Sequence, residues 1–489
     1  MATLSSPGIG SGLDVNAIVA KLVEIERRPI QLLEREESRI QTRLSAFGQL
    51  QSAASALRDA AGKLGQSGAW TPTVGTSSDA GAVTVTTGAA AIAGSYSLQV
   101  SALAAAQSVA AAARPSASSV LGAGTLRIEL GSWNTAQTAF TARPAPPAPQ
   151  PGQPAPAPVA VDIPILETDT LAQIRDKVNA ANVGVSATII TDTAGARLVL
   201  RSSQTGVENG FRTVVTADAP PAGAPGLGVL AYDPSGTSAM TRTAAASNAL
   251  LTINGLQVES ASNTLANTVD GLTLRLQKVT TAPVEVQVSP DTETMKTSMQ
   301  EFVDAYNGLA KLLGDLTRYD EATKSGGTLQ GDSAATGVQR QLRQLVGATS
   351  VASNVFGRLS DVGIEVQRDG TLAIDAARQD RALANLTELR RAFTATSTDA
   401  TQLGFGQRLR QFADAIIGTD GTIASRQQGL QRLLSSNQRR QDDLQERVSL
   451  TEQRIRRQYE ALDTSLANLQ GLQDYVSQTV RALTSGGNR

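Results

Sequence analysis

The sequence predicts an α+β multidomain protein whose terminal helices form a coiled-coil stalk with legs and whose inserted head consists of two β-rich domains. Three observations support this fold class. Apolar residues recur at seven-residue spacing near both ends of the chain. Residues 70–289 are rich in Thr, Val, Gly and Pro and alternate in short runs, which is typical of strands. The length of 489 residues exceeds what one hydrophobic core holds, so several units are expected.

The amino-terminal segment predicts a leg helix that continues into the stalk. Residues 1–12 form a Gly/Ser arm that we expect to be flexible, because its glycines miss the spacing of a dinucleotide-binding loop. Asp14 is a helix cap, and Pro29 is expected to kink or restart the helix. The helix continues to Gly65 with a heptad-spaced stripe. The apolar residues assigned to this leg are Ile18, Leu22, Leu33, Ile40 and Phe47.

The middle of the chain predicts strands with two proline-rich loops. Alternating runs at 83–86, 96–100, 126–130, 272–276 and 284–288 indicate strands. Eight prolines in residues 143–158 predict an exposed extended loop, and residues 217–228 predict a second loop. Thr170 and Gln173 form a capping box that starts a short helix. Hairpins are expected at Ala194-Gly195 and at Asn254-Gly255.

Helical patterns return at Ser289-Pro290, where the proline is expected at the first helical position. An apolar stripe with alternating spacings of four and three follows, and it is assigned to packing inside the stalk: Met295, Met299, Phe302, Tyr306, Leu309 and Leu313. Weaker helices are expected at 334–346 and 378–393, with a hairpin between them formed by residues 359–367 and 372–374. The last helix is expected to begin at Thr422.

Residues 430–483 carry the longest pattern in the chain. The apolar series at seven-residue spacing is Leu434, Gln441, Val448, Ile455, Leu462, Leu469, Val476 and Leu483. The companion series is mostly polar: Leu430, Asn437, Leu444, Thr451, Gln458, Ser465, Leu472 and Thr479. Such a repeat predicts a helix that supercoils with a partner, and the polar series indicates that an assembly covers it. The alternative is a long surface helix on a globular domain.

These patterns predict five parts. The expected boundaries are a leg at 1–40, a stalk at 41–70 and 290–430 with a hairpin near 359–375, an inner head domain at 71–115 and 245–289, an outer head domain at 116–244, and a carboxy-terminal leg at 431–489. In the free subunit we expect both legs to be mobile, because a lone amphipathic helix has little packing to offset its ordering entropy.

Composition excludes several function classes. There is no cysteine and no histidine, which removes thiol nucleophiles, Ser-His-Asp triads and the usual zinc ligands, so no enzyme and no cofactor is expected. A net charge of −1 favours neither nucleic acid nor an anionic membrane. No segment is apolar enough to span a membrane, and no cleaved secretory signal is expected.

Three charged or polar features have alternative interpretations. Asp442-Asp443 and the group Glu34, Glu36 and Glu37 could pair as in glycosidases, but they fit solvated helix faces better. Arg440, Arg447 and Arg454 lie seven residues apart beside the apolar series, which favours selection of a partner helix over nucleic-acid binding. The Thr/Gly/Asn-rich head could bind sugars, yet it lacks clustered Trp and Tyr.

An ordered set of short motifs resembles a known family. The motifs are residues 8–14 (GIGSGLD) with Arg28-Pro29, Asn254-Gly255 with Asn263-Thr264 and residues 271–274 (GLTL), residues 302–307 (FVDAYN), residues 329–332 (LQGD), and Gly363-Ile364 with residues 369–372 (DGTL). Together they resemble the bacterial flagellar filament cap family, FliD or hook-associated protein 2, over nearly the whole chain. The Pro-rich loop departs from the family pattern.

The resemblance implies an extracellular structural protein at the distal tip of the flagellar filament, exported by the flagellar type III system without a cleaved signal. It implies a homo-oligomeric ring of about five or six subunits beneath which flagellin folds and is inserted. Implied partners are flagellin, hook–filament junction proteins and an export chaperone before secretion, with no nucleic acid and no membrane. The competing class is an extracellular adhesin or fibre-tip protein, which needs one anchor rather than amphipathic helices at both ends.

Overall fold

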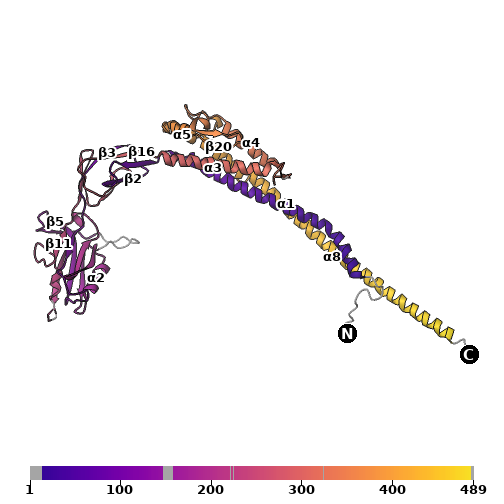
Figure 1. Cartoon of the computed structure of the whole chain (residues 1–489), viewed down its shortest axis with the longest axis horizontal. Helices are drawn as coiled ribbons and strands as arrows, with labels where there is room; N and C mark the ends of the chain where they lie inside the picture. The colour runs from indigo at the N-terminus through magenta and orange to yellow at the C-terminus, as the bar shows by residue number, and fades with distance from the viewer. Residues whose placement is uncertain (1–13, 147–157, 221, 224, 323, 486–489) are drawn as a thin grey trace. The chain divides into compact units, whose positions relative to one another are not determined.

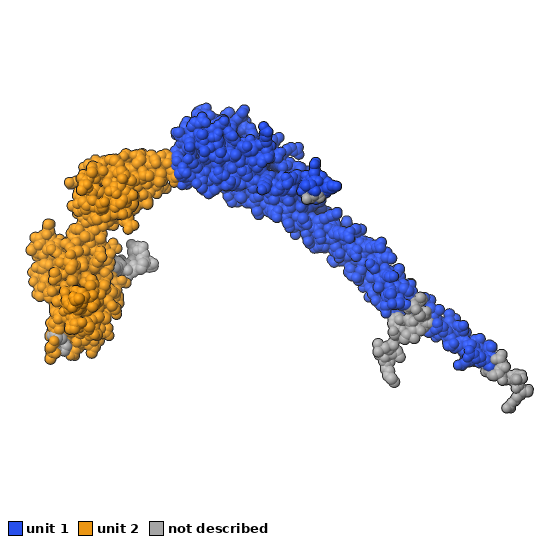
Figure 2. Space-filling view, viewed as in Figure 1, with its two compact units in different colours: residues 1–70, 292–489 blue, residues 71–291 orange. Residues whose placement is uncertain are grey.

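The computed structural model describes residues 14–146, 158–220, 222–223, 225–322 and 324–485. The chain forms two compact units, one of residues 1–70 and 292–489 and the other of residues 71–291, coloured separately in Figure 2. The second unit is inserted between two segments of the first. The predicted Gly/Ser arm at 1–12 and residues 147–157 of the predicted Pro-rich loop lie outside the described residues.

The first unit, which we call the helical unit, is mostly α-helical. Its helices are α1 (Val15–Leu64), α3 (Thr292–Thr317), α4 (Ser333–Gly347), α5 (Ala376–Leu383), α6 (Leu386–Thr394), α7 (Phe405–Ile417) and α8 (Thr422–Ser485). Its 3₁₀ helices are η1 (Ser67–Trp70), η4 (Leu359–Val362) and η5 (Ala400–Gln402), and its small hairpins are β17 (Tyr319–Asp320) with β18 (Ser325–Gly326) and β19 (Ile364–Val366) with β20 (Leu372–Ile374). One hydrophobic core joins α1, α3, α4, α6, α7 and the start of α8.

Local signals explain where several of these helices begin. The Asp14 carboxylate accepts a hydrogen bond from the Ala17 amide at 2.9 Å and caps α1, as predicted. Helix α1 then runs without interruption through Pro29, so the predicted restart is wrong. Pro29 is exposed on the helix surface, where the missing N–H leaves no buried carbonyl unpaired. The last helix begins at Thr422, as predicted.

Three predicted boundaries in this unit are corrected. Pro290 is the last residue of a strand and pairs with Thr73, and helix α3 begins only at Thr292. Residues 359–362 form a 3₁₀ helix, so the predicted strand begins at Ile364. The helix predicted at 378–393 is two helices, because Asn385 caps a new one by accepting from the Glu388 amide at 3.4 Å.

The second unit, which we call the head unit, is β-rich. Its strands are β1 (Thr73–Ser77), β2 (Val83–Thr87), β3 (Gly94–Ala102), β4 (Ser108–Ala110), β5 (Ala123–Trp133), β6 (Phe140–Ala142), β7 (Ala160–Ile165), β8 (Val185–Asp192), β9 (Gly195–Ser202), β10 (Gly210–Ala219), β11 (Thr241–Ala244), β12 (Ala249–Ile253), β13 (Leu256–Ser260), β14 (Thr264–Val269), β15 (Leu272–Leu276) and β16 (Val284–Pro290). Helix α2 (Leu171–Ala180) and the 3₁₀ helices η2 (Val207–Asn209) and η3 (Leu227–Leu230) complete it.

The head strands pair antiparallel in four sheets around two hydrophobic cores. One core lies between the sheet ordered β1-β16-β3-β12-β13 and the sheet ordered β14-β15-β2. The other core involves α2, the sheet ordered β11-β4-β9-β8 and the sheet of β10, β5, β6 and β7. The two predicted hairpins form, with Asn254 (φ 49°) and Gly255 (φ 82°) in the left-handed region that a tight hairpin turn requires. The Thr170–Gln173 capping box also forms.

Candidate functional site

Helices α1 and α8 lie side by side and run in opposite directions (Figure 1). Near the start of α1, the Asn16 side-chain oxygen accepts from the Arg456 guanidinium at 3.3 Å. Farther along, the Leu33 carbonyl accepts from the Asn437 side chain at 3.1 Å. Residue numbers rise in α1 while they fall in α8, so the pair is antiparallel. The partner of the carboxy-terminal heptad helix is therefore, over much of its length, the amino-terminal helix of the same chain.

A polar layer interrupts the apolar packing of this pair. Asn437 is 6 % exposed, and its side chain both donates to the Leu33 carbonyl and accepts from the Gln441 amide at 2.7 Å. Gln441 also donates to the Glu37 carboxylate at 2.7 Å. A buried polar group that finds its hydrogen-bond partners in a single register disfavours all other registers of a helix pair. The polar residues in the predicted seams thus fix the register of α1 on α8.

Apolar packing resumes beyond the polar layer in a small separate cluster. Val19, Val23 and Ile30 of α1 are buried against Val448, with Leu444, Ile455 and Tyr459 partly buried beside them. Of the other predicted seam residues, Leu434 is half-buried against the main core.

Past Tyr459 the same seam is not covered by any of the residues that the structure describes. Leu462, Leu469 and Val476 are 48 %, 63 % and 51 % exposed. The side chain of Leu483 lies outside the described residues. We call residues 462–480 the tail of α8. The tail is an apolar helical face that the described part of its own subunit leaves uncovered.

The residues predicted for the amino-terminal leg separate into two groups. Ile40 and Phe47 are buried in the main core, and Leu33 is half-buried at the polar layer. Ile18 is half-buried and Leu22 is exposed, because they lie beside, rather than on, the stripe that faces α8. The predicted leg residues mix members of two stripes of α1, although the spacing of the two stripes distinguishes them.

The six residues predicted to pack inside the stalk, Met295, Met299, Phe302, Tyr306, Leu309 and Leu313, all lie fully buried in the main core. Burial raises the pKa of Tyr306 to about 12, and its hydroxyl donates to the Gly370 carbonyl at 3.1 Å. The next residue, Asn307, bonds to both backbone groups of Leu372, donating at 2.8 Å and accepting at 2.7 Å. The FVDAYN and DGTL motifs are thus two halves of one contact between α3 and the β19–β20 hairpin.

The LQGD motif joins α4 to α8. Asp332 caps α4 by accepting from the Ala334 and Ala335 amides at 3.0 and 3.3 Å. The same carboxylate lies 2.8 Å from the guanidinium of Arg426 in α8. Gly331 precedes it at φ 75°, a conformation that favours glycine. This motif stabilises the helical unit rather than exposing a reactive group.

The predicted partner-choice arginines face solvent beside an apolar groove. Arg440, Arg447 and Arg454 are exposed, and they take part in none of the ion pairs found among the described residues. The groove is lined by Pro29, Leu32, Leu33, Arg440, Asp443, Leu444 and Arg447. Free guanidinium groups next to the exposed Leu32 are suited to a protein partner that is both apolar and acidic.

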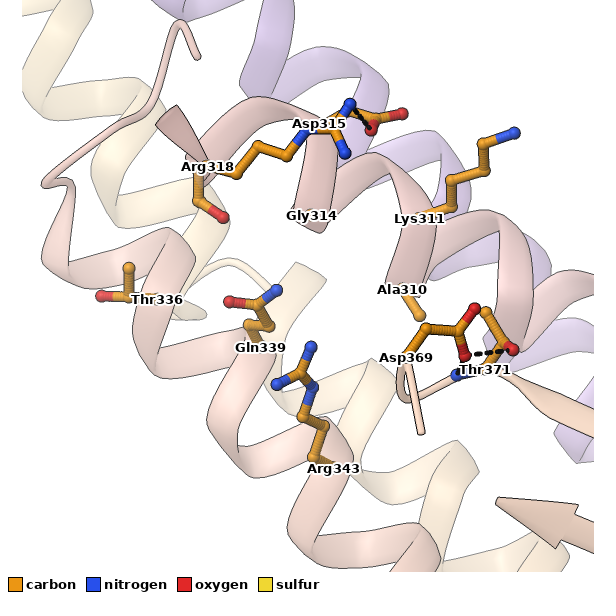
Figure 3. Close-up of a pocket in the computed structure, with 11 residues that line it drawn as sticks. Ala310, Lys311, Gly314, Asp315, Arg318, Thr336, Gln339, Arg343, Asp369 and Thr371 are labelled. Carbon is orange, nitrogen blue, oxygen red and sulfur yellow. Dashed lines mark hydrogen bonds and ion pairs between the residues drawn. The ribbon is translucent and has the colours of Figure 1, made fainter. Parts of the chain in front are cut away.

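A polar pocket lies between α3, α4 and the β19–β20 turn of the helical unit (Figure 3). Asp369 is engaged by the Thr371 amide at 2.9 Å and its hydroxyl at 2.6 Å, and these bonds hold the pKa of Asp369 below its usual range. Asp315 pairs with Arg318 at 3.6 Å. Both carboxylates of this pocket have partners, so neither is arranged as a general base.

The predicted carboxylate groups form no pair that resembles a glycosidase site. Glu36 pairs with Arg39, Glu37 accepts from Gln41 and Gln441, and Asp442 and Asp443 are exposed. Within the described residues, no group of three or more Asp, Glu, His or Cys side chains could hold a metal ion. In the same part of the chain, no helix is both long and apolar enough to cross a membrane.

Comparison with known proteins gives matches along the whole chain. A model of the flagellar hook-associated protein 2 N-terminus matches residues 11–107, a model of its C-terminus matches residues 246–471, and the flagellin hook IN motif matches residues 151–204. The B-type flagellar hook-associated protein 2 of Pseudomonas aeruginosa is 30 % identical, covering 99 % of both chains. The Salmonella typhimurium flagellar hook-associated protein 2 is also 30 % identical over 99 % of both chains.

A solved structure agrees with the fold as well as with the sequence. The crystal structure of the D1-D2-D3 domains of the Escherichia coli flagellar cap protein FliD matches with a TM-score of 0.57 and 28 % identity. The match covers 79 % of this chain and 99 % of that one. The fold is thus shared with that protein over most of the chain.

Proposed function

The chain belongs to the flagellar hook-associated protein 2 family and is a filament cap protein at the flagellar tip. From this premise we propose that its tail docks the cap onto flagellin. The alternative of an adhesin with a single anchor is not favoured, because the similarity includes both helical termini. Subunits of the cap associate with one another above the flagellin filament. Their number, which we expect to be five or six, and the use of an export chaperone and of hook–filament junction proteins as partners are part of the proposal.

The observation that carries the docking proposal is the uncovered seam of α8. A soluble subunit leaves Leu462, Leu469 and Val476 in water although the same seam is covered by α1 up to Tyr459. Apolar faces of this kind mark interaction sites, because burying them is favourable by roughly 25 cal/mol per Å². The tail is therefore assigned to contact with the filament.

A paired substitution tests this assignment in cells. Leu462→Asp with Leu469→Asp places two charges on the seam and is expected to abolish capping, so that flagellin leaks into the medium. Gln478→Asp is the matched control, because the exposed Gln478 lies nine residues from Leu469, which at ~100° per residue is the opposite side of the helix, and its change should leave filaments normal. Full-length filaments on the doubly substituted strain would refute docking through the tail. Native mass measurement of the oligomer with and without residues beyond Arg440 would give the subunit number.

We further propose that this cap protein performs no catalysis, in keeping with its structural family. The carboxylates of the pocket between α3, α4 and the β19–β20 turn are engaged in hydrogen bonds or ion pairs. Metal-independent turnover that a single Asp or Glu substitution in the head unit abolished would contradict this statement.

The division into domains is proposed as predicted, with legs at 1–40 and 431–489, a stalk at 41–70 and 290–430, an inner head domain at 71–115 and 245–289, and an outer head domain at 116–244. The two separate cores of the head unit support the inner and outer division. The polar layer at Asn437 supports a boundary between stalk and leg near that residue. Limited proteolysis of the folded chain, with cleavage sites read by mass spectrometry, tests these boundaries.

A further inference from the structure

The two hydrophobic cores of the head unit are joined where the chain passes from one to the other and back. Residues of the inner core end at Ala104 and resume at Ala249, and all residues of the outer core lie between them. The two crossing segments lie side by side, because Ala105 and Ser247 exchange backbone hydrogen bonds of 2.9 and 3.1 Å. An isolated pair of strands is only marginally stable. Relative motion of the inner and outer head domains is therefore expected unless a further contact prevents it.

A loop of the outer domain supplies that further contact. We call residues 203–207, which follow β9, the latch loop. The Thr205 hydroxyl donates to the Ala261 carbonyl of the inner domain at 2.7 Å. The next amide, that of Gly206, donates to the Ala105 carbonyl at 3.2 Å. The latch loop thus bonds to the inner domain both at the crossing segment and at a separate loop.

Asn248 extends this contact to the inner sheet. Its side-chain oxygen accepts from the Val207 amide at 2.8 Å, and its side-chain nitrogen donates to the Glu259 carboxylate at 2.6 Å. Asn248 directly precedes β12, and Glu259 belongs to the neighbouring strand β13. An Asn side chain has one acceptor and one donor group, and both are used here. One side chain therefore connects the latch loop with two strands of the inner domain.

Gly206 allows the latch loop to approach the inner domain closely. Its φ of 103° is a conformation that residues with a side chain rarely adopt. A Cβ atom at this position would lie 2.6 Å from the Cβ atom and 2.8 Å from the Cα atom of Ala261. Carbon atoms in contact are ~3.5–4.0 Å apart, so there is no room for that atom. A larger side chain at either position would push the latch loop away from the inner domain.

The outer domain holds the latch loop in shape. The Thr205 carbonyl accepts from the Asn209 side chain at 2.6 Å, and the Asn209 side-chain oxygen accepts from the Arg143 guanidinium at 2.7 Å. The Ser203 amide donates to the Gly184 carbonyl at 2.9 Å. All of these bonds lie within the outer domain. The latch loop is therefore a formed part of the outer domain and can hold that domain against the inner one.

We propose that the latch loop locks the outer head domain to the inner head domain, so that the two domains of a subunit move as one body. Release of the latch loop leaves both cores intact and frees the outer domain to swing about the paired crossing segments. Every subunit with a closed latch loop holds its outer domain in the same orientation to its inner domain. The lock lies within the head unit and does not depend on the proposed contact of the tail with flagellin.

Two spin labels test the lock in the full chain, which has no cysteine of its own. Gln287→Cys places one label on β16 of the inner domain, Ile190→Cys places the other on β8 of the outer domain, and both positions are exposed. Double electron–electron resonance is expected to give one narrow distance distribution. Gly206→Val in the labelled chain should roughly double the width of this distribution, because freed domains reorient. A distribution that is already as broad before the change to Val would overturn the lock.

Ala261→Arg tests the same contact from the inner side and should broaden the distribution to the same extent. Gln204→Arg is the matched control, because it adds the same side chain at an exposed position beside the contact and should leave the distribution unchanged. The urea midpoint of Trp133 fluorescence, measured in a Trp70→Phe background, reports whether the outer core remains folded. If Gly206→Val lowers that midpoint, Ala261→Arg alone decides. A distribution for Ala261→Arg that is as narrow as that of Gln204→Arg would refute the lock.

Discussion

Asn307 is the residue whose removal we expect to weaken the helical unit without leaving a large cavity. Its side chain bonds to the amide and the carbonyl of Leu372 at 2.7 and 2.8 Å, and Leu372 is buried. Asn307→Ala leaves both backbone groups without a partner, and each unsatisfied buried group costs ~1–3 kcal/mol. Asn307 itself is half-buried, so water can partly replace it. We therefore expect the free energy of unfolding to fall by about 2 kcal/mol, which is the low-end cost of ~1 kcal/mol for each of the two groups.

The two tryptophans allow this loss to be measured in the full chain. Trp70 is buried in the helical unit and Trp133 in the head unit, so in a Trp133→Phe background the fluorescence reports only the helical unit. With an m-value of about 3 kcal/mol/M, a loss of 2 kcal/mol lowers the urea midpoint by about 0.7 M. Asp304→Ala is the control, because this exposed residue belongs to the same motif and helix. An unchanged midpoint for Asn307→Ala, or an equal shift for Asp304→Ala, would refute the motif-pairing explanation.

Three further predictions concern the same unit. Tyr306 ionises near pH 10 when unfolded but only near 12 when folded, so the stability of the helical unit should fall between these values, and Tyr306→Phe should remove that component in urea titrations at pH 9 and 11. Asp332→Ala removes the cap of α4 and the partner of Arg426 and should cost about 1–2 kcal/mol, whereas Ser333→Ala next to it should change the Trp70 unfolding midpoint little. Hydrogen exchange on the free subunit should show strong protection at 302–313 and weak protection in the tail; equal protection would mean that the tail is already ordered before it meets a partner.

Heptad spacing predicted the long terminal helices well because that spacing is a direct consequence of helix geometry. The pattern could not identify the partner of α8, since an apolar seam is compatible with the same chain, a second copy or another protein. The structure pairs it with α1 as far as Tyr459, and no other described residue covers the tail. Asn437 and Gln441, which are polar members of the two heptad series, are the residues that set the register.

The errors have local physical causes. Helix α7 was missed because it begins after Gly404, which supplies no side-chain cap, and because the charged Arg408 is buried among its apolar residues Phe405, Leu409 and Ile416. The Arg408 guanidinium donates hydrogen bonds to the Thr349, Ala400 and Leu403 carbonyls. No sequence pattern predicts such long-range bonds to the backbone. Ser289-Pro290 resembles a helix start, yet pairing of β16 with β1 continues through Pro290. The boundary between β16 and α3 is thus set by long-range strand pairing and not by the local preference of Ser-Pro for a helix start.

The strand pair that closes the head unit has an evolutionary consequence. Thr73 pairs with Pro290, and the Asp291 amide donates to the Pro72 carbonyl, so the chain enters and leaves the inserted unit at adjacent points. A segment whose two ends meet can be lengthened, exchanged or deleted during evolution without altering the packing of the helices on either side. Selection on the outer surface and selection on polymerisation can therefore act on separate parts of one gene. A bacterium could renew what its flagellar tip displays while preserving the helices that assemble it.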